Sequence, residues 1–315
     1  MNGGEKKIEI LKPFGEAFEL TQKILFQPFN FEKWLVMGFA AFLAGHLTGA
    51  GFNVPLGNFP PRNGNQTVPT PDFEQWKPML PIIIAVFAVV MVIFIVVFTW
   101  LRARGNFIFT DCIARNRAAI VEPWREYRKE GNSYFLFLLI LAFGSILIFG
   151  LICLLGFAVF GFPGHGSDNA GMTPLLVVFL GLFLVVWLGY AFFFGLTAYF
   201  MVPLMYVRRF RAGEAFKHVA GLVLEHAGSF ILFCLFGICL LLGVGMVSGI
   251  ATCLTCCLAL LPYVGTVILL PVFVFLRSYA LRFIRQFGSD YDVWAVSANA
   301  EAAPVPPPTP PPLQT

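Results

Sequence analysis

The sequence predicts an all-α, polytopic integral membrane protein with six transmembrane helices and additional amphipathic interfacial helices on the cytoplasmic side. The first observation is composition: 58% of the 315 residues are hydrophobic and 12% are charged, about half the charged share of a soluble domain. The second is that six apolar segments approach or exceed the roughly 20 residues that a helix needs to cross a bilayer. The third is that Lys and Arg are concentrated in alternate connections between these segments.

The six expected spans cover, in chain order, about residues 34–52, 79–101, 134–162, 174–206, 229–253 and 257–283. The first contains His46 and several glycines, and the fourth is longer than one crossing requires, so we expect a tilt or a kink at Pro203. Together they form one membrane domain over residues 1–291. Residues 292–315 include a run of prolines, which cannot form a helix, and are expected to be a disordered cytoplasmic tail.

Basic residues set the expected orientation, because Lys and Arg beside apolar segments are retained in the cytoplasm. Of the 21 basic residues, only Arg62 and Lys77 fall outside one set of alternate connections. The other basic residues precede the first span, join the second to the third and the fourth to the fifth, and close the sixth. We therefore expect the chain in the inner (plasma) membrane, with both termini in the cytoplasm and residues 53–78 as an outer loop.

The tetrapeptide GEAF occurs at Gly15–Phe18 and again at Gly213–Phe216. Each copy opens a stretch that is apolar on one helical face and charged on the other, and that leads into an expected span. Such a helix is suited to lie in the headgroup plane of a membrane. A third stretch of this kind, without the tetrapeptide, runs from Phe109 to Tyr127. The sequence thus predicts three repeated units, each an interfacial helix followed by a hairpin of two spans.

Two segments resemble a known family. The pattern F-x-x-A-F-x-L-T-x-K-I-L-F-x-P-F at Phe14 to Phe29 and the pattern R-G-x-F-I-F-x-D at Arg104 to Asp111 are similar to those of uncharacterised bacterial six-span membrane proteins. Those proteins resemble in turn the membrane domain attached to glycerophosphoryl diester phosphodiesterases. The resemblance covers residues 10 to 290 and carries over no catalytic residue. It implies a membrane-embedded accessory domain that acts near lipids.

The expected spans are nearly free of ionisable residues, with the exception of His46 and of arginines at the inner end of the sixth. This argues against ion-coupled transporters and proton pumps, which must hold a charge within the membrane. The four histidines form no HExxH pair, and the chain has no phosphate-binding loop and no nucleophile elbow. We therefore expect no enzymatic activity, no cofactor and no metal centre. The formal charge of +4 is too small to suggest a nucleic-acid partner.

The main candidate functional residues are seven cations between the second and third expected spans. They face the anionic inner leaflet, where each cation near the surface contributes on the order of 1 kcal/mol of attraction. The candidate contacts to lipid headgroups are Arg102, Arg104, Arg115, Arg117, Arg125, Arg128 and Lys129.

Small residues and cysteines supply two further sets of candidates. Glycines four residues apart allow helices to approach closely, within one bundle or between protomers, and the pairs are Gly45 with Gly49 and Gly245 with Gly249. A C-x-x-C spacing can hold a disulfide or a soft metal, although small packing residues are the favoured interpretation of Cys253, Cys256 and Cys257.

These features favour a non-enzymatic membrane scaffold or lipid-associated accessory protein. Its expected partners are membrane lipids, together with a second copy of the chain or another membrane protein. The first alternative is a transporter or channel for a small solute with an uncharged pore, which would require a continuous wet path. The second is an intramembrane lipid enzyme, which would require a polar pocket at the inner interface built from Asp111, Glu126, Glu214 and Glu225.

Overall fold

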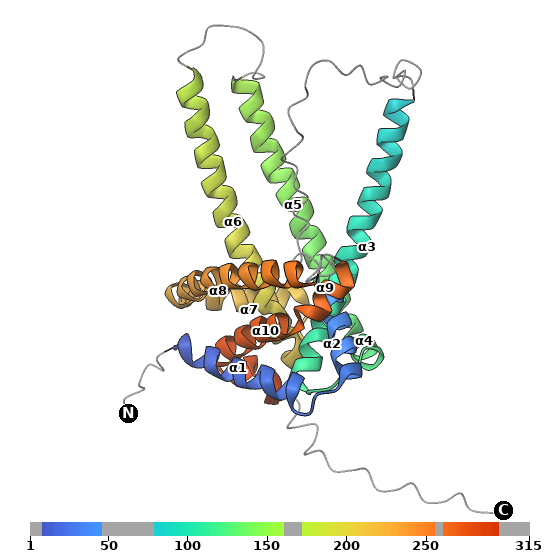
Figure 1. The fold of residues 1–315 in the computed structure, drawn as a ribbon. Coiled ribbons are helices and arrows are strands. Elements are labelled where there is room, and N and C mark those ends of the chain that lie inside the picture. The colour runs from blue at the N-terminus through green and yellow to red at the C-terminus, as the bar shows by residue number, and fades with distance from the viewer. Residues whose placement is uncertain (1–7, 46–78, 161–171, 256–260, 296–315) are drawn as a thin grey trace, which may run out of the picture.

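The computed structural model describes residues 8–45, 79–160, 172–255 and 261–295, and every element in these ranges is helical (Figure 1). This confirms the predicted all-α class. The elements are α1 (Leu11–Phe26), α2 (Phe31–Leu43), α3 (Leu80–Ala114), α4 (Val121–Glu126), α5 (Arg128–Phe160), α6 (Met172–Arg208), α7 (Ala212–Glu225), α8 (Ala227–Leu254), α9 (Pro262–Ile268), α10 (Leu270–Arg285) and the short 3-10 helix η3 (Ser289–Tyr291).

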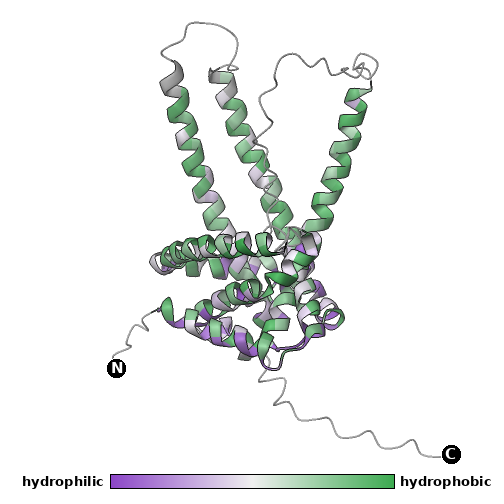
Figure 2. Cartoon of the chain, viewed as in Figure 1, coloured by the Kyte–Doolittle hydropathy of each residue, from purple (hydrophilic) through white to green (hydrophobic). Residues whose placement is uncertain are grey.

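Four helices, α3, α5, α6 and α8, are long and apolar enough to cross a membrane. The chain is therefore a multi-pass membrane protein. The helices α3, α5 and α6 rise from one end of the molecule, and α8 runs across their base (Figure 1). Figure 2 shows that the rising parts are apolar on all sides, whereas polar residues gather at the base. A helix that is apolar all round must be covered by protein or by lipid, and the described protein does not cover these parts.

The described chain does not show six crossings. The first predicted span, residues 34–52, overlaps α2, which has 13 residues and ends at Leu43, and residues 46–52 lie outside the described ranges. The sixth, residues 257–283, is divided into α9 and α10, which have 7 and 16 residues. These helices are shorter than a crossing requires.

The division of the sixth predicted span has a local cause at Pro271. Proline has no amide hydrogen, so it cannot donate to the carbonyl four residues earlier. That carbonyl belongs to Val267, and it accepts instead a hydrogen bond of 2.9 Å from Trp34 Nε1 in α2. The chain therefore turns at Leu269, and α10 lies along α1 at the base.

The hydrophobic core lies at the base of the molecule rather than between the rising helices. The helix α3 shows the change along its own length: most residues before Trp100 are exposed, whereas nearly all residues from Ala103 to Ala114 are buried. Lipid tails are as apolar as leucine, so the outer parts need no protein contact. At the base, apolar side chains from several helices are buried against one another, which stabilises the fold.

Aromatic rings join the inner ends of α6, α8 and α10. Phe200 of α6 lies 5.4 Å from Phe230 of α8, measured between ring centroids, and Phe233 of α8 lies 4.5 Å from Phe283 of α10. Rings at these separations attract one another beyond the burial of their surface. The cluster therefore fixes α8, which otherwise buries few side chains, to the rest of the base.

The first GEAF segment lies in α1, and its predicted apolar face packs on the protein. Ala17, Thr21, Ile24 and Leu25 are buried, and α1 lies along α10. Phe18 on the same helix is 61% exposed. The periodicity thus identifies the helix and its apolar face, which is mostly buried.

A side-chain bridge places the N-terminal helices beside the arginine-rich connection after α3. Lys33 Nζ donates to the Ile24 carbonyl at 2.9 Å and to Asn116 Oδ1 at 2.7 Å. Asn116 follows α3 and has a positive φ of 50°, a conformation that Asn tolerates better than most residues. The two basic regions therefore lie at the same end of the molecule, as the predicted orientation requires.

The third predicted interfacial helix, from Phe109 to Tyr127, does not form as a separate element. The helix α3 continues past the predicted end of the second span at residue 101 and reaches Ala114. Phe109 and Cys112 are fully buried in its inner half, because the core requires the apolar side chains of this segment. Only α4, with six residues, follows. The prediction of three equal units is therefore wrong at this connection.

Close helix contact occurs at glycines other than the predicted pairs. A Cβ added to Gly245 or Gly249 would meet no atom within 4 Å, so this pair makes no tight contact in the described chain, and its use between two copies stays a prediction. Gly49 lies outside the described ranges, and Gly45 has a φ of 88° and lies against the Arg102 side chain. The closest approach among the described glycines is at Gly105, where a Cβ would lie 2.3 Å from the carbonyl carbon of Leu43.

Replacing Gly105 by Ala should destabilise the protein, because the new methyl group would overlap the backbone at the end of α2. We expect a loss on the order of 1–3 kcal/mol of unfolding free energy, as is typical of overpacking, measured as a lower thermal unfolding midpoint in detergent. Gly15→Ala is the matched control, because no atom lies within 4 Å of its added Cβ. Equal midpoints for the two variants would contradict the close packing of α2 on α3.

Candidate anion-binding site

The seven predicted headgroup cations differ in the structure in whether they form ion pairs, line a pocket or are exposed to solvent. Two of them, Arg115 and Arg117, form ion pairs with carboxylates. Three others line one cleft, and they are Arg104, Arg125 and Arg128. Arg102 lines a different pocket, and Lys129 is exposed at the start of α5. The seven cations therefore have different surroundings in the fold, and their contact with lipid headgroups stays a prediction.

Asp111 is the centre of the ion-paired group. Its carboxylate has no exposure to solvent, and it accepts hydrogen bonds of 2.9 Å from Arg117 Nε and from the Tyr206 hydroxyl. Arg115 Nε lies 3.3 Å from the same carboxylate. A buried charge is tolerated only when it is paired and hydrogen-bonded. Asp111 therefore binds the end of α3 to the connection that follows it and to the inner end of α6.

Glu126, the last residue of α4, extends this network. Its carboxylate accepts hydrogen bonds from Arg115 Nη2, at 3.1 Å, and from Arg209 Nη2 beyond α6. Burial acts to raise the pKa of Glu126, but the charges of Arg115 and Arg209 outweigh it and hold the pKa below its usual value of 4.5. Glu126 therefore stays ionised near neutral pH and joins α4 to α6.

Tyr127 closes the network from the side of the core. Its ring stacks on that of Tyr206, with 4.8 Å between the ring centroids. Arg209 Cζ lies 3.9 Å from the centroid of the Tyr127 ring and makes a cation–π interaction with it. Burial raises the pKa of Tyr127 to about 12, so the phenol remains neutral. The arginines of this group are thus held by protein groups and are not free to bind a lipid headgroup.

A cleft of about 480 Å³ lies beside this network, between α3, α4 and α5. We call it the Trp–Arg cleft, and its lining residues are Trp100, Arg104, Trp124, Arg125 and Arg128. Two indole rings and three guanidinium groups thus converge on one cavity.

Arg104 forms the floor of the Trp–Arg cleft and is held in place from three sides. Its guanidinium carbon lies 4.7 Å from the Trp100 centroid and 4.9 Å from the Trp124 centroid. Its Nη2 donates to Asn132 Oδ1 at 2.9 Å. Gly131 leaves room for it, because a Cβ there would lie 3.0 Å from Arg104 Cγ. Arg104 is only 7% exposed, so its position is set by the protein before any ligand arrives.

The positive charge in the Trp–Arg cleft is not neutralised by any described carboxylate. The ion pairs of the described residues use other arginines as cations, namely Arg115, Arg117, Arg208, Arg209, Arg282 and Arg285. Three uncompensated guanidinium groups in one cleft create a positive potential that favours an anion. Arginine is also the side chain best shaped to bind phosphate oxygens in pairs.

The other predicted groups lie elsewhere. Glu214 and Glu225 are exposed on α7, while Asp111 and Glu126 are held by arginines. Cys253 is a free, exposed thiol near the end of α8, and Cys256 and Cys257 lie outside the described residues. Within the described ranges, no three His, Cys, Asp or Glu side chains are placed to hold a metal ion.

Sequence reasoning missed Trp100 and Asn132 as parts of the site. Trp100 and Arg104 are four residues apart in α3, a spacing that places them on one helix face. This half of the cleft could therefore have been predicted from the sequence. Asn132 comes from α5 and reaches Arg104 only because α3 and α5 pack together. No local pattern could have identified it.

The fold and the cleft define a multi-pass helical membrane protein with an unneutralised cationic cleft at the base of its long helices. The chain belongs to a family of unknown function, DUF7544, whose profile matches residues 9–271. No curated protein and no solved structure matches the chain. The resemblance to the membrane domain of glycerophosphoryl diester phosphodiesterases gains no support from this match.

Replacing Asp111 by Asn should destabilise the protein, because Arg115 and Arg117 would lose the fully buried carboxylate that both contact and would keep only their more exposed partners, Glu126 and Glu122. Breaking a buried ion pair in this way costs on the order of 3–5 kcal/mol, and we expect a clear fall in the thermal unfolding midpoint in detergent. Glu122→Gln is the control, since Glu122 also pairs with Arg117 but its side chain is 64% exposed, and exposed pairs contribute about 0–1 kcal/mol. A midpoint for Asp111→Asn no lower than for the control would contradict this role.

Proposed function

We propose that this chain is a non-enzymatic, lipid-associated membrane protein whose Trp–Arg cleft binds the headgroup of an anionic phospholipid at the cytoplasmic surface. The observation that carries the proposal is the convergence of Arg104, Arg125 and Arg128 on one cleft without a described carboxylate partner. A phospholipid phosphate supplies the missing negative charge.

The position of the cleft along the length of α3 supports the proposal that the bound anion is a lipid. The exposed apolar part of α3 ends near Trp100, and the buried core begins at Ala103. The cleft therefore lies at the level where the apolar surface of the helix gives way to polar protein. Tryptophan favours this boundary between lipid tails and headgroups, and the two indoles of the cleft match it. Cations at the same level gain attraction from anionic lipids.

The orientation belongs to the same proposal. We place the base, with its arginines and N-terminal lysines, in the cytoplasm of the inner (plasma) membrane, because basic residues next to apolar segments are retained there. In this arrangement the two termini are cytoplasmic and residues 53–78 lie outside. Of the predicted six crossings, the first remains part of the proposal, since residues 46–52 lie outside the described residues, whereas the sixth does not, because it is divided into α9 and α10.

The double variant Arg125→Gln/Arg128→Gln should lose the preference for anionic lipid. Two cations that each contribute about 1 kcal/mol predict a loss of about 30-fold in relative affinity at low ionic strength. The measurement is native mass spectrometry of the full chain with equal amounts of phosphatidylglycerol and phosphatidylcholine, read as the ratio of the two bound lipids.

The control removes the same charge elsewhere on the base. Arg211→Gln/Lys217→Gln replaces two exposed cations on and beside α7, and it should leave the lipid ratio close to that of the unchanged chain. If both double variants reduce the ratio equally, the attraction is a property of the whole basic surface and the cleft is not the site.

The proposed orientation predicts which introduced cysteines react from outside. In right-side-out membrane vesicles, Asn65→Cys should react with a membrane-impermeant maleimide before any permeabilisation, and Lys217→Cys should react only after it. The unchanged chain, which has seven cysteines, gives the background labelling. The reverse pattern would place the base outside the cytoplasm and would overturn the proposed orientation.

A further inference from the structure

Arg102 lies on the opposite side of α3 from the Trp–Arg cleft. Two residues along a helix correspond to a rotation of about 200°, so Arg102 and Arg104 point to different faces. Arg102 lines a pocket of about 300 Å³ between α3, α5 and α6, which we call the polar pocket for its hydrogen-bonding side chains, although apolar residues such as Leu138 and Phe194 also line it. The polar side chains that line this pocket with it are Thr99, Asn106, Tyr134 and Tyr199.

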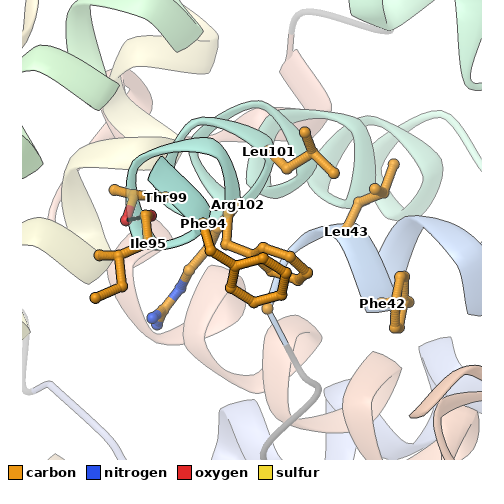
Figure 3. Close-up of a pocket in the computed structure, with 9 residues that line it drawn as sticks. Phe42, Leu43, Phe94, Ile95, Thr99, Leu101 and Arg102 are labelled. Atoms are coloured by element: carbon orange, nitrogen blue, oxygen red, sulfur yellow. Dashed lines mark hydrogen bonds between the residues drawn. The ribbon is translucent and has the colours of Figure 1, made fainter. Parts of the chain in front are cut away.

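A second, apolar pocket of about 340 Å³ adjoins the polar one. The two pockets share Thr99 and Arg102. The apolar pocket is lined mainly by the rings and chains of Phe42, Leu43, Phe94, Ile95, Phe98 and Leu101. Figure 3 shows the guanidinium of Arg102 on the side of Ile95 and Thr99, away from Phe42 and Leu43. A cationic end and an apolar end therefore meet at one residue.

Much of the hydrogen-bonding capacity of the polar pocket is unused. Thr99 donates to the Ile95 carbonyl at 2.7 Å, and Tyr134 donates to the Ala198 carbonyl at 3.0 Å. The guanidinium of Arg102 and the hydroxyl of Tyr199 take part in none of the hydrogen bonds or ion pairs among the described residues. Each is thus available to a ligand that accepts hydrogen bonds.

A second cation lies behind Tyr199 and also lacks a negative partner. Arg277 of α10 is 2% exposed, and its Nη2 donates to Thr110 Oγ1 at 2.8 Å. Its guanidinium carbon lies 5.1 Å from the Tyr199 centroid, and its Nε has no hydrogen-bond partner. No described carboxylate pairs with it. A buried cation without a counter-charge is costly, and an anion on the other side of the Tyr199 ring would reduce that cost.

We propose that these two joined pockets form a second lipid site, in which the phosphate of a phospholipid binds Arg102 and Tyr199 and one acyl chain lies along Phe94 and Phe98. Arg277 is a supporting charge rather than a direct ligand. The phosphate chemistry alone would also fit a free phosphate ion, but only a lipid accounts for the apolar pocket that continues from the same arginine. This site uses different side chains from the Trp–Arg cleft and does not depend on it.

The experiment follows the thermal unfolding midpoint of the full chain in detergent as phosphatidylglycerol is added. It is carried out in the Arg125→Gln/Arg128→Gln background, so that binding in the Trp–Arg cleft does not contribute. Phosphatidylglycerol should raise the midpoint, because a ligand that binds the folded state stabilises it. Adding Arg102→Gln should weaken the apparent affinity at least about tenfold, as expected for the loss of a charged hydrogen bond.

Two further variants separate a binding role from a folding role. Arg102→Lys keeps the charge and should recover part of the affinity, and Tyr199→Phe keeps the ring over Arg277 while removing only the hydroxyl, so it should weaken binding without unfolding the base. An effect of phosphatidylglycerol that persists unchanged in Arg102→Gln would overturn the site, even if the Trp–Arg cleft binds lipid as proposed.

A parallel titration with sodium phosphate, against sodium chloride of equal ionic strength, distinguishes the two sources of the anion. A shift with phosphatidylglycerol and none with phosphate supports the lipid. An equal shift with phosphate alone, lost in Arg102→Gln, would overturn the lipid assignment and make the site one for a free oxyanion. No shift with either would overturn the site altogether.

Discussion

A fully buried carboxylate constrains the base of this protein. Asp111 has no exposure to solvent, and a group of this kind is stable only if cations and donors surround it. Arg115, Arg117 and Tyr206 meet that need, and in doing so they set the relative positions of α3, of the connection to α4 and of α6. The Glu126 carboxylate then accepts hydrogen bonds from Arg115 and from Arg209. The inner ends of the long helices are therefore held by charge as well as by the aromatic cluster, while their outer parts are left to the lipid.

This network also explains why some arginines are available to ligands and others are not. Arginines that follow α3 in the sequence reach the acidic side chains of α3 and α4 and are neutralised there. Arg102 and Arg104 on α3, Arg125 on α4 and Arg128 on α5 form no ion pair with a described carboxylate. The base thus contains arginines that form ion pairs and arginines that form none among the described residues, and the proposed lipid sites use only the second group.

Composition and periodicity were sufficient to predict an all-α membrane protein and the helices α1 and α7, and they drew attention to the basic region that contains the Trp–Arg cleft. They were not sufficient to count the crossings. Pro271 leaves the Val267 carbonyl without its helical donor, and the division at Leu269 is completed by Trp34, more than two hundred residues away, which donates to that carbonyl. Hydropathy contains no information on that partner. The continuation of α3 to Ala114 was missed for a related reason, since positive charge at Arg102 and Arg104 reads as the end of a span although the helix itself does not stop there. The predicted glycine pairs do not mark the close contacts between the described helices, because spacing along one helix does not show which helix lies opposite. Gly105 allows a close contact because the end of α2 crosses α3 at this residue.

The unbroken course of α3 has a mechanical consequence. The same 35-residue rod that stands in the lipid also forms the centre of the base, with no proline within it beyond its first turn to act as a joint. A helix whose apolar length exceeds the local bilayer thickness responds by tilting, and here any tilt of the outer part must rotate the buried part as well. The part of α3 that is exposed along its apolar length and the part that lies in the core therefore belong to one continuous helix, so the orientation of one cannot be set independently of the other.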